Sequence, residues 1–218
     1  MKKSLIVSFV LLCAFSALAA DTAQYSVTFT RHWTEKTHPF EYPEAGLLTG
    51  PHFSGLIGAS HDGAYKIFKE GARPTPGLEK LSEEGKHSPL DAEIKAAIAA
   101  GKAGALFETG PIREDMGSES TEVTVNRKFP MVSAVAMIAP SPDWFAGAAD
   151  VNLMEGGKWV ATKTVDLYAY DAGSDDGKTY KADDMDNRPK KSTMSANTPH
   201  FVNKGRKVRV ATLTFTKK

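Results

Sequence analysis

Apolar and polar side chains alternate with a period of two in several parts of this chain. Residues 25–30, 121–125 and 160–170 all show this alternation. Alternation in segments rich in aromatic and β-branched residues predicts strands with one buried face. Residues 131–139 are apolar throughout, which predicts a central strand buried on both faces.

The C-terminal run, residues 207–216, is also typical of a strand, but its apolar positions change parity between Val210 and Leu213. A β-bulge near Ala211 would reconcile the two halves, and so would burial on both faces.

Helical signals are few. Ser88 stands where a helix cap is expected, Pro89 fits the first helical position, residues 94–98 form an apolar stripe, and Gly101 ends the pattern. A shorter helix is predicted over residues 78–85. Because strands dominate, the sequence predicts a mainly all-β fold, an antiparallel β-sandwich with one or two short helices in its connections.

Two segments are predicted to be loops. Residues 38–63 are rich in Pro and Gly, which indicates a long loop region with short strands at most. Residues 181–195 are polar and include Asp183 and Asp184, so we expect a solvated loop there. No internal repeat and no linker divides the chain.

The first twenty residues are typical of a secretory signal peptide. Lys2 and Lys3 precede an apolar stretch over residues 5–18, and small residues at 17–19 suit cleavage. The apolar stretch is shorter than the roughly 20 residues that a membrane span needs. We therefore expect residues 1–20 to be removed and the protein to be secreted or periplasmic.

Removal of this segment changes the composition of the chain. The single cysteine, Cys13, is lost, so no disulfide can stabilise residues 21–218. The formal charge falls from +1 to −1 because two lysines are also removed. This charge disfavours nucleic acid as a partner, and no second apolar segment is long enough to cross a bilayer.

Two Pro- and Gly-rich segments carry clustered carboxylates. Residues 139–145 read Ala-Pro-Ser-Pro-Asp-Trp-Phe, and residues 170–177 read Tyr-Asp-Ala-Gly-Ser-Asp-Asp-Gly. If both loops lie at one end of the sandwich, Asp143, Asp171 and Asp175 approach one point. Three such carboxylates repel one another unless a cation lies between them, and Ca²⁺ prefers these ligands. The alternative is that all three are ordinary turn-forming aspartates.

These two segments resemble the signature of the spondin N-terminal domain family, of the F-spondin and mindin type. The resemblance extends over nearly all of residues 21–218. It includes Trp33, His38-Pro39, Tyr42-Pro43, the His-Phe-Ser-Gly-Leu-Ile-Gly run at 52–58, Ser60-His61, Gly71, Trp159 and Asp166-Leu167-Tyr168. It implies a β-sandwich with one Ca²⁺ ion held by Asp143, Asp171 and Asp175. Some members add an acidic ligand on the strand before the first motif. Thr124 stands at that position here, with Glu122 nearby, so the fourth ligand is open.

Other chemistries find less support. Four histidines, at positions 32, 38, 52 and 61, lie close in sequence, but no partner completes a zinc-site spacing, which favours structural roles. Ser60 lacks the Gly-x-Ser-x-Gly context of a hydrolase nucleophile. Trp144, Phe145 and Trp159 are expected to pack rather than to bind a ligand.

The sequence therefore predicts a secreted, calcium-binding, spondin-like module that is not an enzyme. Adhesion or binding to an unknown extracellular or cell-surface ligand is the expected role. One alternative is a calcium-dependent site for carbohydrate or lipid headgroups, with exposed aromatics beside Asp143. Another is a metal-dependent hydrolase, in which His200 or a spare aspartate would act as the base.

Overall fold

The computed structural model describes residues 21–44, 50–113 and 117–218. The predicted signal peptide lies outside these residues. Within them, no helix combines the length and the apolar character that crossing a membrane requires.

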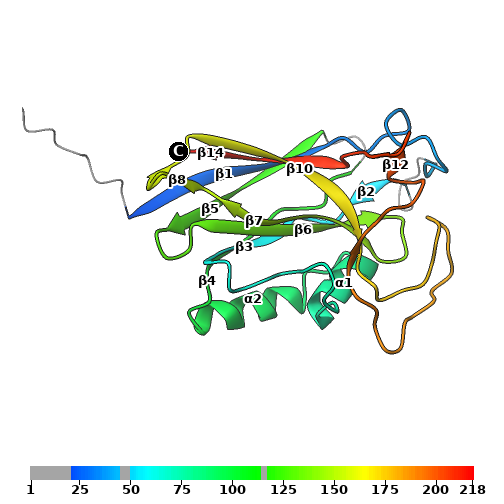
Figure 1. Ribbon diagram of the computed structural model, residues 1–218, viewed down its shortest axis with the longest axis horizontal. Coiled ribbons are helices and arrows are strands. Elements are labelled where there is room, and N and C mark those ends of the chain that lie inside the picture. The colour runs from blue at the N-terminus through cyan, green and yellow to red at the C-terminus, as the bar shows by residue number, and fades with distance from the viewer. Residues whose placement is uncertain (1–20, 45–49, 114–116) are drawn as a thin grey trace, which may run out of the picture.

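One large antiparallel sheet forms the body of the protein, and it folds over into two layers (Figure 1). The strand order is β4 (Ala103–Glu108), β3 (Ile57–His61), β6 (Met131–Ala139), β7 (Trp144–Asn152), β10 (Thr162–Asp171), β14 (Ala211–Lys217), β1 (Thr22–Arg31) and β5 (Ser118–Asn126).

The layers are joined by β10, which contributes to both. Residues 162–167 of β10 pair with β14, and residues 168–171 pair with β7. Strands that switch sheets in this way form the corners of β-sandwiches. The predicted antiparallel β-sandwich is therefore confirmed.

Short elements complete the fold. Two helices, α1 (Pro76–Glu84) and α2 (Leu90–Ala99), lie against the outer face of the layer that contains β3 and β6 (Figure 1). The minor strands are β2 (His52–Phe53), β8 (Met154–Glu155), β9 (Lys158–Trp159), β11 (Met194–Ser195), β12 (Val202–Asn203) and β13 (Arg206–Lys207).

Two hydrophobic cores follow from this arrangement. The larger core lies between the layers and receives Tyr25, Val27 and Phe29 from β1, all fully buried. The smaller core joins the sheet to the helices and includes Val135 of β6. Because Val132, Ala134, Ala136 and Ile138 belong to the first core, β6 is buried on both faces, as predicted for residues 131–139.

One local prediction is wrong. Ser88 does not cap α2, because Pro89 itself takes the N-cap position and no side chain bonds there. Of the two explanations given for the change of parity near Ala211, burial on both faces agrees with the structure. Residues 210–213 are all buried, and the pairings of β14 show no bulge.

His38 should make the protein sensitive to acid. Its ring is buried, its Nδ1 lies 2.9 Å from Thr37 Oγ1, and burial lowers its pKa to about 4, although the Val208 carbonyl partly opposes the shift. Between about pH 6.5 and pH 4 the unfolded chain binds this proton and the native state does not. His38 therefore lowers the free energy of unfolding as the pH falls through that window, by about 3 kcal/mol for a shift of this size.

Replacing His38 by Asn should flatten this part of the pH profile. Urea unfolding of both proteins at pH 7 and pH 4.5 measures how much free energy of unfolding each loses on acidification. An equal loss in both proteins would contradict the assignment.

Candidate functional site

The two acidic motifs meet at one end of the sandwich. Asp143 lies in the turn between β6 and β7, and Asp171 is the last residue of β10. The pairing of β7 with β10 places Trp144 opposite Asp171, and the Ala172 N–H donates to the Asp143 carbonyl at 3.2 Å. The loops that the sequence predicted to converge are therefore neighbours, at the right-hand end of Figure 1.

Asp143 is the buried centre of this region. Its Oδ2 accepts hydrogen bonds from the backbone N–H groups of Ser174 at 2.8 Å and Asp175 at 3.1 Å. Its Oδ1 is buried and has no hydrogen-bond partner in the described part of the chain. Burial, followed by the nearby charge of Asp171, raises the pKa of Asp143 to about 7. One oxygen is thus bound by the loop, while the other lacks compensation.

Asp171 is the second carboxylate of the region. It is half-buried, and its Oδ1 accepts the Gly173 N–H at 2.9 Å. Burial raises its pKa as well, although the Gly173 hydrogen bond opposes the shift. Both aspartates therefore carry a desolvation cost that a nearby cation would offset.

The Asp175 carboxylate is hydrogen-bonded by backbone groups on two sides. Its Oδ1 accepts the Gly177 N–H and its Oδ2 accepts the Met185 N–H, both at 2.6 Å. These bonds connect its own loop to residues 181–195. That segment is solvated at Asp183 and Asp184, as predicted, but it also buries Asn187 and Thr193 against the motif loop.

The structure thus brings Asp143 and Asp171 together, and the Asp175 carboxylate also bonds backbone N–H groups of its loop and of Met185. Within residues 21–44, 50–113 and 117–218, no three His, Cys, Asp or Glu side chains form a group ready to hold a metal. The four histidines weighed as zinc ligands belong to no such group either. The assignment of Ca²⁺ to Asp143, Asp171 and Asp175 stays a prediction.

A carboxylate from outside the two motifs also approaches this region. Glu83, on α1, hydrogen-bonds with the Ser174 side chain, and burial raises its pKa. Ser174 Oγ in turn lies 3.3 Å from Asp143 Oδ2. Sequence reasoning missed Glu83 because only the packing of α1 against the sheet brings it here, and its spacing from Asp143 carries no signal.

The positions considered for a fourth ligand lie elsewhere. Glu122 accepts a hydrogen bond from Gln24 Nε2 at 2.6 Å and forms an ion pair with Lys218. Lys218 follows the C-terminal end of β14, whereas the start of β14 pairs with Leu167, near the motif loops. Thr124 lies further along β5 in the same direction. Neither side chain reaches the motif loops.

Comparison with known proteins agrees with these motifs. The profile of the Spondin_N family matches residues 23–207. The chain belongs to the spondin N-terminal domain family. It is 36% identical to human Spondin-2 over 173 residues, which cover 78% of this chain and 50% of that protein. It is 34% identical to human Spondin-1 over 170 residues, which cover 75% of this chain and 20% of that protein. The chain thus spans about half, or a fifth, of these relatives.

The aromatic residues of the spondin motif pack, as predicted. Trp144 and Phe145 are almost fully buried. The Trp144 ring lies 5.1 Å from both His200 and Phe201, and Phe145 stacks on Tyr170 at 5.4 Å between ring centroids. These contacts fix the β7 end of the site and bury both rings of the first motif.

Steric constraints explain why the second spondin motif has glycine at position 173. Gly173 has a φ of +83°, and a Cβ there would lie 2.7 Å from the Lys191 carbonyl oxygen.

We expect Gly173→Ala to destabilise the protein by about 3 kcal/mol, because left-handed strain of ~1–2 kcal/mol adds to a clash with backbone. Gly156→Ala is a matched control, since Gly156 has a φ of +55° with nothing within 4 Å. Urea unfolding of both variants measures the difference, and equal losses would contradict the packing argument.

Proposed function

We propose that this protein is an exported, non-enzymatic binding module of the adhesion type, stabilised by one Ca²⁺ ion beside Asp143 and Asp171. The observation that carries the proposal is the Oδ1 atom of Asp143, buried and unpartnered in the described chain next to a second carboxylate. A buried charge without compensation destabilises a fold, so such an atom favours a bound cation. Membership of the spondin N-terminal family supports the binding role.

The residues present fit a hard cation. Asp143 Oδ1 and the Asp171 carboxylate are the side-chain ligands we assign, and carbonyls of the motif loop with water would complete the six to eight oxygens that Ca²⁺ takes. The ion would supply positive charge that neutralises both aspartates. Asp175 would act indirectly, by holding the loop through its bonds to Gly177 and Met185.

The hydrolase alternative is met by a triad-like arrangement of Ser133, His61 and Asp150, but the proton of the His61 ring lies on the wrong nitrogen for catalysis. His61 Nε2 lies 2.7 Å from Ser133 Oγ and 3.8 Å from Asp150 Oδ1. However, His61 Nδ1 accepts the Gly63 N–H, so the proton resides on Nε2, which donates to Ser133. His61 cannot then deprotonate Ser133, as a base in a catalytic triad must. Both side chains are fully buried, which favours a structural role.

His200, the other base considered, is also engaged. Its ring nitrogens lie 3.2 Å from Thr198 Oγ1 and 3.2 Å from Glu41 Oε2. The carbohydrate or headgroup alternative required exposed aromatics beside Asp143, whereas Trp144 and Phe145 are buried. Binding of a partner protein is therefore the role that the geometry supports best.

Calorimetric titration of the chelator-treated protein with Ca²⁺ tests the proposal. We expect one bound ion per chain, and no turnover of ester, phosphate or glycoside substrates with Ca²⁺ or Zn²⁺. Failure to bind Ca²⁺ at millimolar concentration would contradict the metal assignment. Metal-dependent turnover that disappears in Asp143→Ala would instead support the hydrolase.

A further inference from the structure

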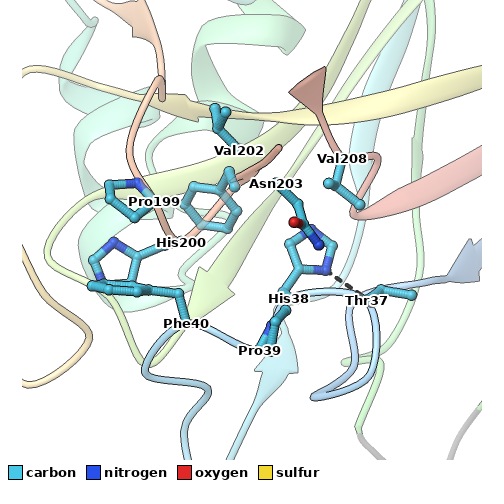
Figure 2. Close-up of a pocket in the computed structure, with 10 residues that line it drawn as sticks. Thr37, His38, Pro39, Phe40, Pro199, His200, Val202, Asn203 and Val208 are labelled. Carbon is cyan, nitrogen blue, oxygen red and sulfur yellow. Dashed lines mark hydrogen bonds between the residues drawn. The ribbon is translucent and has the colours of Figure 1, made fainter. Parts of the chain in front are cut away.

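A small pocket opens between two loops near Trp144. It has a volume of about 210 Å³ and lies between residues 37–40 and the segment 199–208 (Figure 2). Its wall includes His200 and Phe201, whose rings both pack on Trp144. The pocket therefore belongs to the same loop end as the acidic motifs, although it is a separate cavity.

The size of the pocket suits one ring. An apolar cavity of about 150 Å³ accommodates benzene, whereas sites for drug-sized ligands are typically about 300–1,000 Å³. A volume of about 210 Å³ is thus sufficient for one substituted aromatic ring but too small for a larger ligand. A single side chain of another protein fits this description.

The wall of the pocket includes no lysine, arginine or carboxylate. Its residues are Thr37, His38, Pro39, Phe40, Pro199, His200, Phe201, Val202, Asn203 and Val208, with no Lys, Arg, Asp or Glu. His38 is neutral at physiological pH because burial lowers its pKa to about 4. A charged group would lose its hydration here without gaining a partner, so the occupant must be neutral and largely apolar.

Phe40 gives the rim an exposed aromatic surface. Its side chain is 44% exposed, although its ring packs edge-on against His200 at 5.0 Å. Aromatic rings prefer such edge-on or offset contacts, which add to the area that they bury. A second ring in the pocket would make these contacts with Phe40 and Phe201.

The surroundings of the pocket are positively charged on one side. The β12–β13 hairpin, which supplies Val202 and Asn203 to the wall, also carries Lys204, Arg206 and Lys207. All three are exposed. Lys207 bonds Ser195 Oγ, and across the pocket Glu41 is engaged with His200. The hairpin therefore favours acidic residues beside the inserted ring.

We propose that this pocket binds an aromatic side chain, such as tyrosine, carried by an acidic segment of a partner protein. The ring enters the cavity between Phe40 and Phe201, and the flanking carboxylates contact Lys204 and Arg206. The inference rests on the proposed binding role of the domain, but it does not require a Ca²⁺ ion.

Titration of the ¹⁵N-labelled protein with short peptides tests this proposal by NMR. The probe is acetyl-Glu-Glu-Tyr-Glu-Glu-amide at low salt. We expect chemical-shift changes concentrated in residues 37–41 and 199–208. Peptides with Ala in place of Tyr, or Lys in place of Glu, should bind at least tenfold more weakly. Shifts centred elsewhere, or equal binding of the Lys peptide, would overturn the proposal.

Two variants separate the cavity from the charges. Val202→Phe fills the pocket and should remove binding, while Lys204→Glu combined with Arg206→Glu should weaken binding at least tenfold without altering the fold. Lys158→Glu, on the exposed β8–β9 hairpin, is the control. Unchanged affinity in the hairpin double variant would contradict the acidic partner.

Two further arms identify the source of the ring and the role of the ion. N-acetyltyrosinamide should bind at least tenfold more weakly than the peptide. Equal affinity would assign the pocket to free aromatic molecules and overturn the protein partner. Repeating the titration with chelator keeps the two proposals distinct. If the peptide binds but the protein does not respond to Ca²⁺, only the proposed ion site is refuted. A Ca²⁺ response without peptide binding refutes the pocket alone.

Discussion

Adding Ca²⁺ to the chelator-treated protein is expected to raise its melting temperature. An ion that binds only the native state stabilises it by mass action, by about 2.7 kcal/mol at a hundredfold excess over the dissociation constant. The effect should be large here because Asp143 and Asp171 are both desolvated in the native state, and residues 21–218 contain no cysteine. Differential scanning calorimetry with chelator and with millimolar Ca²⁺ measures the shift.

Single substitutions locate the ion. Asp143→Ala and Asp171→Ala should each remove the Ca²⁺-dependent shift, while Asp184→Ala, at an exposed position, should retain it. Asp175→Ala should lower the melting temperature even with chelator, because Gly177 and Met185 lose the acceptor of their N–H groups. Identical Ca²⁺ responses in all four variants would show that the ion, if bound, lies elsewhere.

Asp143→Asn is expected to stabilise the metal-free protein above about pH 7. The native pKa of Asp143 is raised to about 7 from an ordinary value of 3.8, so the native state resists ionisation. The ionised Asp143 therefore lowers the free energy of unfolding by its full amount above pH 7. This destabilisation is lost as the pH falls from about 7 to 4, because the native carboxyl becomes protonated. At ~1.4 kcal/mol per unit of pKa shift, the neutral amide should gain a few kcal/mol at pH 8 and little at pH 4.

The geometry allows this replacement. The amide oxygen can accept the N–H groups of Ser174 and Asp175, and the amide nitrogen can occupy the place of the unpartnered Oδ1 and donate toward Asp171. Asp175→Asn is the matched control with the opposite sign, since an amide cannot accept two backbone N–H groups at separate oxygens. Urea unfolding in chelator at pH 8 and pH 4 measures both variants. Destabilisation by Asp143→Asn at pH 8 would contradict the buried, uncompensated carboxylate.

Much of the fold could be predicted from the periodicity of side chains. The alternation around Tyr25, Val27 and Phe29 reports one buried face, and the unbroken apolar run of β6 reports two, because side chains in strands point alternately to either side. Sequence alone could not show that β10 is shared by both layers, since a change of pairing partner leaves no mark on a strand of regular alternation.

The candidate site was predictable in part for a similar reason. The motif letters identify Asp143 and Asp171, and strand pairing brings them together. The motif does not reveal that both carboxylate oxygens of Asp175 accept hydrogen bonds from backbone N–H groups, because that depends on how residues 181–195 return to the loop. Glu83 was missed because its position follows from helix packing, which has no local sequence signature.

The shared strand β10 has a mechanical consequence. Residues 162–167 are bonded to β14 and residues 168–171 to β7, so tension applied along β10 must shear hydrogen bonds in both layers at once. Asp171 ends this strand and adjoins Asp143 in the turn that opens β7. An ion bound between them would fasten the end of the strand to the neighbouring turn. Its occupancy would then set how much tension along β10 the fold withstands.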